Sequence, residues 1–208
     1  MAVATRMRKT KHQVRTEETQ ARILDAAEAV FSEQGFDKTQ LDEVAARAGF
    51  TRGAIYAHYE SKEDLFLALV EQRVLTRFKR MRQVIEAEPS IGKRPGIFRE
   101  WIAAQADDHT WGTLMLEFKL YALRRPESRE KLLRLYELMT KASGSDFIES
   151  LFGASLDKTK RAAAERRLVL LGSILSAVYL ESLYRPKLMA KQYLQPVLDE
   201  LFDVLIHA

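Results

Sequence analysis

The sequence predicts an all-α protein: an N-terminal three-helix domain with a helix-turn-helix, then a C-terminal helical bundle, about nine helices in total. Apolar residues recur every three or four positions along most of the chain, as on the buried face of a helix. No stretch alternates apolar and polar residues in the way that a half-buried strand does. The 208 residues are 47% hydrophobic and 30% charged, which is ordinary for a globular protein with a buried core.

The first helix is predicted to begin near Thr16. Threonine is a suitable N-cap, and the two glutamates that follow it carry the negative charge that a helix N-terminus favours. An apolar stripe then runs from Ile23 to Phe31. Gly35 can end this helix by adopting a left-handed conformation.

Two short helices are predicted next. The segment "TQLD", beginning at Thr39, resembles a capping box and opens the helix "LDEVAARA", which Gly49 closes. Thr51 can cap the following helix, "RGAIYAHY". Val44 and Ile55 are the expected core between the two helices. Two short helices joined by a glycine-containing turn indicate a helix-turn-helix.

The rest of the chain is predicted as longer helices. One opens at a second capping box, Ser61 to Asp64, and stops before Pro89. The others are expected at about residues 97–105, 111–123, 127–152 with a bend at 143–145, 158–183 and 189–206.

The second short helix carries residue types suited to DNA. In a helix-turn-helix, the N-terminal residues of the second helix meet base edges in the major groove. Arg52 can donate two hydrogen bonds to guanine, and Thr51 can bond a base or a phosphate. Gly53 lets the backbone approach the duplex. Tyr56, His58 and Lys62 offer donors to phosphate oxygens.

These residues lie in a longer pattern: "ARILDAAEAVFSEQGF", then "T", then "VAARAGFTRGAIYAHYESKEDLF". The pattern, at about residues 20–66, resembles the DNA-binding domain of the TetR family of bacterial transcriptional regulators, in particular its multidrug-efflux regulators. The resemblance implies groove contacts by Thr51, Arg52 and Gly53. The backbone contacts that it implies are those of Thr39, Tyr56, His58 and Lys62. Glu60 departs from the family, which often has a basic residue there, so contact at that corner is in doubt.

Charge and chain order suggest three parts: a basic arm at 1–15, the helix-turn-helix domain at 16–62, and a ligand-binding and dimerisation domain at 63–208. Residues 1–16 hold five lysines and arginines and no acidic residue, a net charge of +5. A basic arm fits contact with nucleic acid or an anionic membrane, and a merely solvated tail is the other reading.

The last two helices are predicted to form a homodimer interface, because one helix-turn-helix reads one half-site and a palindromic operator needs two. The resemblance implies a four-helix bundle across the two-fold axis; packing within one chain is the alternative. The predicted interface residues are Leu168, Leu171, Leu175, Val178, Leu194, Val197, Leu198, Leu201 and Leu205.

The middle helices are rich in large apolar and aromatic residues, interrupted by single polar ones. Such a set suits a cavity that is apolar with a few orienting donors, although plain core packing is the alternative. The predicted ligand-binding residues are Trp101, Gln105, His109, Trp111, Met115, Phe118, Tyr121 and Tyr136. By resemblance, a bound small molecule shifts the fourth helix and so changes the spacing of the DNA-reading helices.

Other classes of protein find little support. The chain has no cysteine, so disulfides and thiolate metal sites are excluded. The four histidines are scattered without metal-ligand spacing, and no phosphate-binding or hydrolase motif occurs, so we expect no enzyme, metal or cofactor. The N-terminus lacks the apolar stretch of a secretory signal, and the longest strongly apolar run has 13 residues, too few to span a bilayer.

The sequence thus predicts a cytoplasmic, ligand-responsive repressor. It would bind a double-stranded palindromic operator as a homodimer, and a small hydrophobic or amphipathic molecule would release it. The alternative is a helical small-molecule-binding protein whose helix-turn-helix no longer functions.

Overall fold

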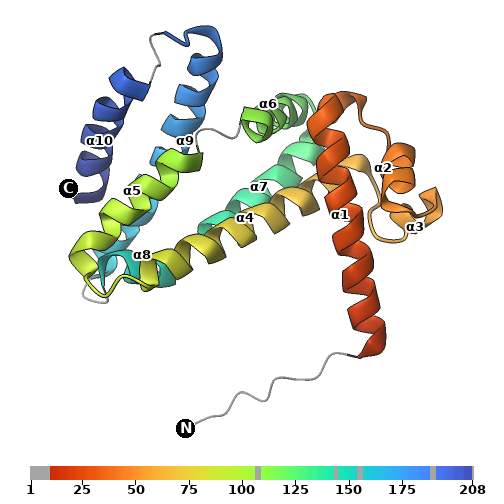
Figure 1. The fold of residues 1–208 in the computed structure, drawn as a ribbon, viewed down its shortest axis with the longest axis horizontal. Helices are drawn as coiled ribbons and strands as arrows, with labels where there is room; N and C mark the ends of the chain where they lie inside the picture. Colours follow the sequence, from red (N-terminus) through yellow and green to blue (C-terminus); the bar gives the residue numbers. More distant parts are fainter. Residues whose placement is uncertain (1–9, 106–108, 143–144, 154–156, 188–190, 208) are drawn as a thin grey trace. The chain divides into compact units, whose positions relative to one another are not determined.

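The computed structural model describes residues 10–105, 109–142, 145–153, 157–187 and 191–207. These residues form α-helices and one short 3-10 helix, with no strand among them (Figure 1). The all-α prediction is therefore confirmed. The elements are α1 (Lys11–Lys38), α2 (Leu41–Ala48), α3 (Arg52–Tyr56), α4 (Lys62–Glu86), η1 (Ile91–Lys93), α5 (Arg94–Gln105), α6 (His109–Leu123), α7 (Pro126–Ala142), α8 (Ser145–Phe152), α9 (Lys158–Tyr184) and α10 (Lys191–His207).

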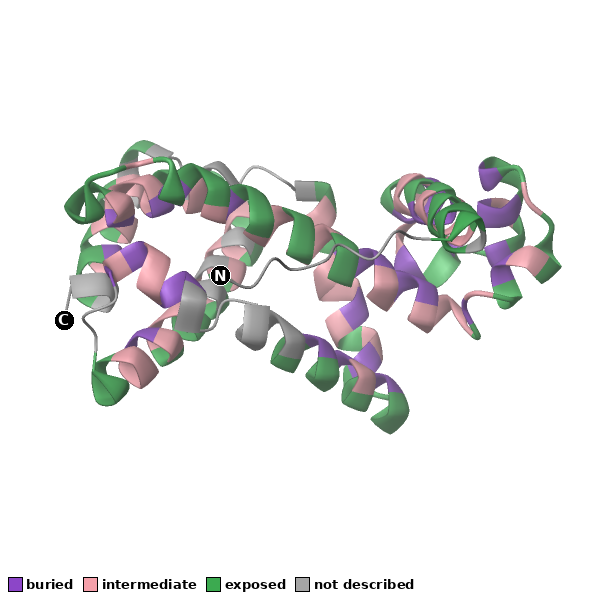
Figure 2. Ribbon diagram, turned by 90° about the horizontal axis from the view of Figure 1, so that it is seen from below, coloured by how far each residue is buried: buried purple, intermediate pink, exposed green. Residues whose placement is uncertain are grey.

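The chain divides into two compact units, Met1–Val70 and Glu71–Ala208, with the boundary inside α4. Buried residues (purple) and exposed residues (green) alternate along the helices of each unit, as expected for amphipathic helices (Figure 2). The segment predicted as one bent helix at 127–152 is divided into α7 and α8 at the predicted bend.

The first unit is built around three phenylalanines. Phe31 and Phe36 from α1 and Phe66 from α4 are fully buried, with ring centroids 5.0 to 6.0 Å apart. The two contacts of Phe66 are edge-on, a favoured geometry for aromatic pairs. This cluster fixes α4 against α1, so the three-helix domain continues into the first turns of α4.

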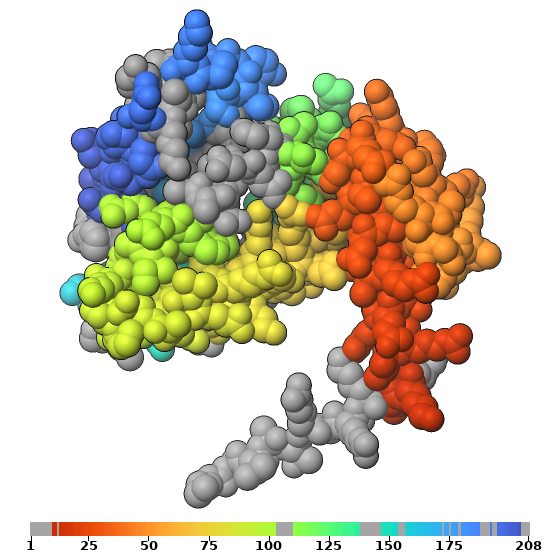
Figure 3. Space-filling model, viewed as in Figure 1, coloured from red at the N-terminus to blue at the C-terminus, as the bar shows by residue number. Residues whose placement is uncertain are grey.

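The start of α1 differs from the prediction. Thr10, not Thr16, is the N-cap: its hydroxyl accepts the Gln13 N–H at 3.2 Å, and Gln13 Oε1 accepts the Thr10 N–H at 2.9 Å. This capping box extends the helix beyond the predicted start. The first turns of α1 (red) therefore extend beyond α2 and α3 (Figure 3). Gly35 does interrupt α1, with φ 80° and ψ 174°, before the helix resumes to Lys38.

The second unit has its own core, to which five helices contribute: Met81, Ile85, Phe98, Phe147, Leu151, Leu171 and Phe202. Phe98 and Phe147 stand edge to face with centroids 5.5 Å apart. The helices α6 and α7 bury a further set, including Leu114, Phe118 and Leu132.

Candidate nucleic-acid interface

The turn between α2 and α3 depends on Gly49. Its φ of 72° and ψ of 34° are left-handed, which glycine adopts without steric cost. The Phe50 N–H donates to the Ala45 carbonyl at 2.9 Å, so the open end of α2 is satisfied. A Cβ at Gly49 would also stand 3.1 Å from an Arg22 guanidinium nitrogen. The left-handed backbone therefore accounts for the glycine, and the Arg22 side chain would also have to move slightly to admit a Cβ.

Arg22 holds the turn from α1. Its guanidinium donates to the Ala48 carbonyl at 2.9 Å, and its central carbon lies 4.7 Å from the centre of the Phe50 ring. Sequence reasoning missed this residue, because an arginine 26 positions before its partner leaves no local signal.

The two short helices pack as predicted. Val44 and Ile55 are fully buried, and Ala45 is nearly so, which lets the helices approach closely. Thr51 caps α3, and its hydroxyl accepts the Ala54 N–H at 3.3 Å. Because Ile55 faces inward, α3 turns Arg52, Gly53 and Tyr56 toward solvent.

Arg52 is exposed but held by two neighbours. Its guanidinium donates to Asp42 Oδ2 at 3.0 Å and to the Tyr56 hydroxyl at 3.3 Å, and it lies 5.4 Å from the centre of the Tyr56 ring. The hydrogen bond to Tyr56 and the charge of Asp42 raise the pKa of the guanidinium above its ordinary value. Tyr56 itself is 43% exposed.

Gly53 has no reason within the chain to be glycine. It is helical with a negative φ, and a Cβ there would meet only the Thr51 hydroxyl, at 3.9 Å. Glycine in a helix costs about 0.5–1 kcal/mol relative to alanine. The missing side chain therefore leaves a low surface beside Arg52.

The other predicted DNA contacts are placed differently. Thr39 is only 1% exposed, and its hydroxyl donates to the Gly35 carbonyl at 2.7 Å. The predicted capping role of Thr39 is wrong, since the N-cap of α2 is Gln40 and no side chain caps it. The buried Thr39 side chain does not reach the exposed surface.

His58 and Lys62 lie beyond the end of α3. His58 is partly exposed, with its ring centre 6.3 Å from that of the buried Tyr59, whose pKa is raised by burial. Lys62 Nζ donates to the Asp37 carbonyl at 2.8 Å and lies 4.9 Å from the centre of the Phe36 ring. Lys62 thus ties α4 to the end of α1. Glu60 is exposed.

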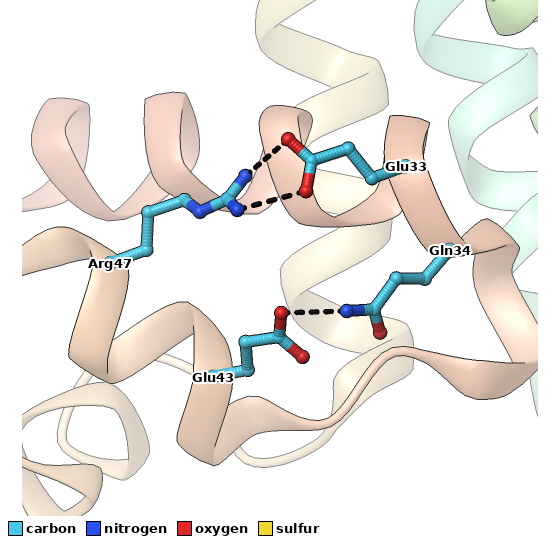
Figure 4. A network of polar contacts seen from close by, with 4 residues as sticks. All are labelled: Glu33, Gln34, Glu43 and Arg47. Atoms are coloured by element: carbon cyan, nitrogen blue, oxygen red, sulfur yellow. Dashed lines mark hydrogen bonds and ion pairs between the residues drawn. The ribbon is translucent and has the colours of Figure 1, made fainter.

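A polar network joins α1 to α2 (Figure 4). Arg47 donates to both carboxylate oxygens of Glu33, at 2.6 and 2.8 Å, and Gln34 donates to Glu43 at 2.6 Å. The hydrogen bond from Arg47 lowers the pKa of the Glu33 carboxyl below its ordinary value. A two-bond arginine–carboxylate pair is geometrically specific, so it helps to fix the orientation of α2.

The residues predicted to bind a ligand occupy three helices of the second unit. Trp101 packs against its core from α5, and Phe118 is fully buried with its ring centre 6.2 Å from that of Tyr121. Trp111 lies under the Arg73 guanidinium at 4.4 Å, and Met115 is partly buried on α6. Tyr136 on α7 is 37% exposed. The side chains of Gln105 and His109 lie outside the described residues.

A depression of about 460 Å³ lies elsewhere in the second unit, among η1, α5 and α10. Its lining is Glu88, Gly92, Lys93, Pro95, Gly96, Ile97, Arg99, Glu100, Phe202 and Asp203. None of the predicted ligand residues lines it, so their role stays a prediction. Over the described part of the chain, no group of three histidine and acidic residues could hold a metal ion.

The predicted dimer residues need one correction. Leu171 is 4% exposed in the core of its own chain, so it is not available to a second subunit as predicted, while Leu168 is only partly buried against that core. Val169 and Leu170, which lie between these two leucines, are more than half exposed. Val178, Leu198 and Leu201 are partly exposed and Val197 is 53% exposed, while the side chains of Leu175, Leu194 and Leu205 lie outside the described residues.

Helix α9 is long and apolar enough to cross a membrane by length and composition alone. Of the 18-residue window that meets this test, only 7% is buried inside the chain. Few of the described residues of this apolar helix are therefore fully buried in one copy of the protein.

Known proteins match the chain in its first unit. Residues 23–69 match the family described as "Bacterial regulatory proteins, tetR family". The HTH-type transcriptional regulator AcrR of Shigella flexneri is 50% identical over 64 residues, which are 31% of this chain and 29% of that relative. Across four curated relatives, the matched segment spans 29% to 58% of their own length.

Solved structures share the fold of nearly the whole chain. The fatty acid degradation regulator FadR from Bacillus halodurans has a TM-score of 0.61 and 21% identity, over 94% of this chain and 96% of that one. The transcriptional regulator FadR from Bacillus subtilis, solved in complex with stearoyl-CoA, has a TM-score of 0.53 and 17% identity over 89% and 97%. At these identities the likeness extends to the fold alone.

Proposed function

We propose that this chain is a ligand-responsive transcriptional regulator, because residues 23–69 match the tetR family of bacterial regulatory proteins and hold a packed helix-turn-helix. It acts as a cytoplasmic repressor, binds a palindromic operator as a homodimer, and is released by a small hydrophobic or amphipathic molecule. It has no catalytic role.

The observation that carries this proposal is the exposed end of α3. Arg52 and Tyr56 project from the second helix of a packed helix-turn-helix, and Gly53 lies between them with room for a side chain that it lacks. Glycine at this exposed helical position lowers the stability of α3, and no contact within the chain requires it. Close approach of a duplex to the Gly53 backbone supplies the missing reason.

The roles that we assign follow from exposure. Arg52 reads a guanine edge, since its guanidinium can donate two parallel hydrogen bonds. Tyr56, His58 and the amine of Lys62 contact phosphates, and Thr51 contacts a base or phosphate beside the cap that it forms. Thr39 contributes no side-chain contact, because it is buried.

Dimerisation is proposed from the uncovered apolar surface of α9 and α10. Val169, Leu170 and Leu180 on α9 are exposed, as are Val197 and Val204 on α10. Large exposed apolar patches on a soluble protein mark interaction sites. A second copy packed on this face covers the patch and places two helix-turn-helix domains for the two half-sites.

The effector is proposed to bind the second unit, and relatives suggest its chemistry. A protein of the same fold is known in complex with stearoyl-CoA, an amphipathic molecule. The effector would act through different affinities for the two states of the dimer. Helix α4 begins in the first unit and ends in the core of the second, so a shift of this helix would carry the change.

The test is selection of genomic DNA fragments on the purified protein at about 150 mM salt, a physiological ionic strength. Wild type should recover a near-palindromic site, and Arg52→Ala should not. Arg124→Ala, which removes an exposed arginine next to α6, controls for loss of one positive charge. Recovery of random DNA by all three proteins would favour the alternative, a helical small-molecule-binding protein with a non-functional helix-turn-helix.

A further inference from the structure

An acidic residue stands where a DNA-reading surface should avoid one. Asp42 lies in the first turn of α2, with its side chain 61% exposed and its carboxylate 3.0 Å from Arg52. A fixed negative charge beside the groove-reading residue repels phosphates and lowers affinity for every DNA sequence. An aspartate at this position therefore lowers the affinity for DNA, so its charge is expected to have another use.

The geometry around Arg52 gives the Asp42 charge such a use. The Arg52 guanidinium lies between the Asp42 carboxylate from α2 and the Tyr56 hydroxyl from the next turn of α3. The guanidinium carbon also lies over the Tyr56 ring, 5.4 Å from its centre, which adds a third contact. These contacts thus favour one orientation of a flexible side chain before any DNA is bound.

On the basis of the proposed function, we propose that Asp42 is a positioning residue that sets the sequence specificity of Arg52. It presents the guanidinium ready for a base edge, so less side-chain freedom is lost on binding the operator. Its charge also weakens binding to DNA that offers Arg52 no matching base. Both effects widen the gap between operator and other DNA.

The contact is suited to this role because it is weak. Both side chains of the pair are more than 60% exposed, and such surface ion pairs contribute little to stability. Arg52 can therefore keep or exchange the contact when a guanine accepts its hydrogen bonds. A buried pair would hold the arginine too firmly to allow this.

The first experiment measures the dissociation constants for the selected operator and for a scrambled duplex of equal length. Asp42→Ala is compared with Asp25→Ala, which removes an exposed acidic residue from α1 of the same unit. We expect Asp42→Ala to bind the scrambled duplex more tightly and to lower the operator preference about tenfold, within the range of one arginine–guanine contact. Asp25→Ala should keep the wild-type preference.

Three results would overturn the inference. An equal preference in Asp42→Ala and Asp25→Ala means that Asp42 positions nothing that reads sequence. A higher preference in Asp42→Ala means that Asp42 competes with DNA for Arg52. A wild type with no operator preference removes the proposed function itself, and this inference with it.

A second measurement needs no DNA. The ordering of the Arg52 Nε–H bond, from NMR relaxation in the free protein, should be high in wild type and in Asp25→Ala. It should fall in Asp42→Ala to the level of an exposed arginine such as Arg124. If the Arg52 side chain in wild type is as mobile as that of Arg124, the Asp42 contact does not order it. The inference then fails, independently of any result on DNA binding.

Discussion

Two glycines of the helix-turn-helix are glycine for opposite reasons. Gly49 has a left-handed backbone and an arginine at 3.1 Å from the site of a Cβ, so the fold itself requires it. Gly53 has a helical backbone and open space around it, so the fold would gain from a side chain there. Gly49 is therefore expected to matter for the stability of the fold, and Gly53 for DNA binding.

Exchanging each glycine for alanine tests this separation. Gly53→Ala should keep or raise the free energy of unfolding, by up to about 1 kcal/mol, while operator binding weakens. Gly49→Ala should lower the free energy of unfolding by more than about 1 kcal/mol, because alanine is strained at positive φ. Thermal unfolding and operator titration of both variants measure the two effects. Unchanged operator binding by Gly53→Ala would remove the main support for a DNA-facing α3.

Lys62 combines a structural contact with a proposed phosphate contact. Lys62→Met keeps an apolar side chain of similar length but removes the amine that donates to the Asp37 carbonyl and lies over the Phe36 ring. If the amine also meets a phosphate, binding should weaken for all sequences and the slope of log affinity against log salt should flatten by about one. A lower melting temperature with an unchanged salt slope would leave Lys62 with its structural role alone.

At the scale of elements, the orientation of α2 depends on its polar links to α1. Since Arg47 lowers the pKa of Glu33 in the folded state, the pair stabilises the fold fully above the unfolded pKa of about 4.3. This contribution is lost as the pH falls through the lower folded pKa. Stability should therefore fall on acidification partly through this pair.

The isosteric variant Glu33→Gln isolates that effect. Wild type should be more stable than Glu33→Gln at pH 7, and the gap should narrow as the pH falls through the lowered folded pKa, where the glutamate becomes protonated and resembles glutamine. Urea unfolding of both proteins from pH 3 to 7 measures the gap. A gap that does not change with pH would mean that packing, and not charge, accounts for it.

The exposed face of α9 predicts how subunits associate. Leu170→Glu places a charge on the proposed interface and should give a monomer by sedimentation where wild type is a dimer. Operator binding should then fall toward the non-specific level, about a thousandfold or more. Leu133→Glu, at a similarly exposed leucine on α7, is the matched control and should stay dimeric. A dimeric Leu170→Glu would place the interface elsewhere.

Periodicity predicted these helices better than it predicted their ends and faces. The buried Val44 and Ile55 and the left-handed Gly49 follow from local rules of helix pattern and turn. Thr10 and Thr16 are both acceptable caps, and only the reciprocal bond with Gln13 distinguishes them. On α9, Leu168 and Val169 are both apolar, and the core of the second unit decides which faces inward.

Local rules of helix pattern and turn could not predict contacts between residues that are far apart in the sequence. The Arg22 bond to Ala48 and the Lys62 bond to Asp37 each join residues about 25 positions apart, and no spacing rule relates them. The Asp42–Arg52 contact joins two helices whose mutual orientation must be known first. The residue types of the proposed DNA-facing surface could be predicted from the sequence, but the residues that contact them within the chain could not.

At the scale of the whole molecule, a two-fold dimer fixes the distance between its two reading helices. Adjacent half-sites should then lie about 10 base pairs apart or a multiple of this, since both major grooves must face the protein. Inserting about 5 base pairs at the operator centre should abolish specific binding, because it turns one half-site to the opposite face of the duplex. Inserting 5 base pairs outside the half-sites is the control. Tolerance of the central insertion would mean that subunits bind independently.

The bond from Arg22 to the turn has a consequence for how the domain folds. The segment proposed to read DNA, from α2 to α3, has fewer than 20 residues, but an arginine from an earlier helix, α1, completes its turn. The proposed recognition surface is therefore complete only when α1 is packed against the turn, and not when α2 and α3 alone have formed. If α1 were unfolded around Arg22, the residues of α2 and α3 would all be present, but the turn that orients α3 would lack its support.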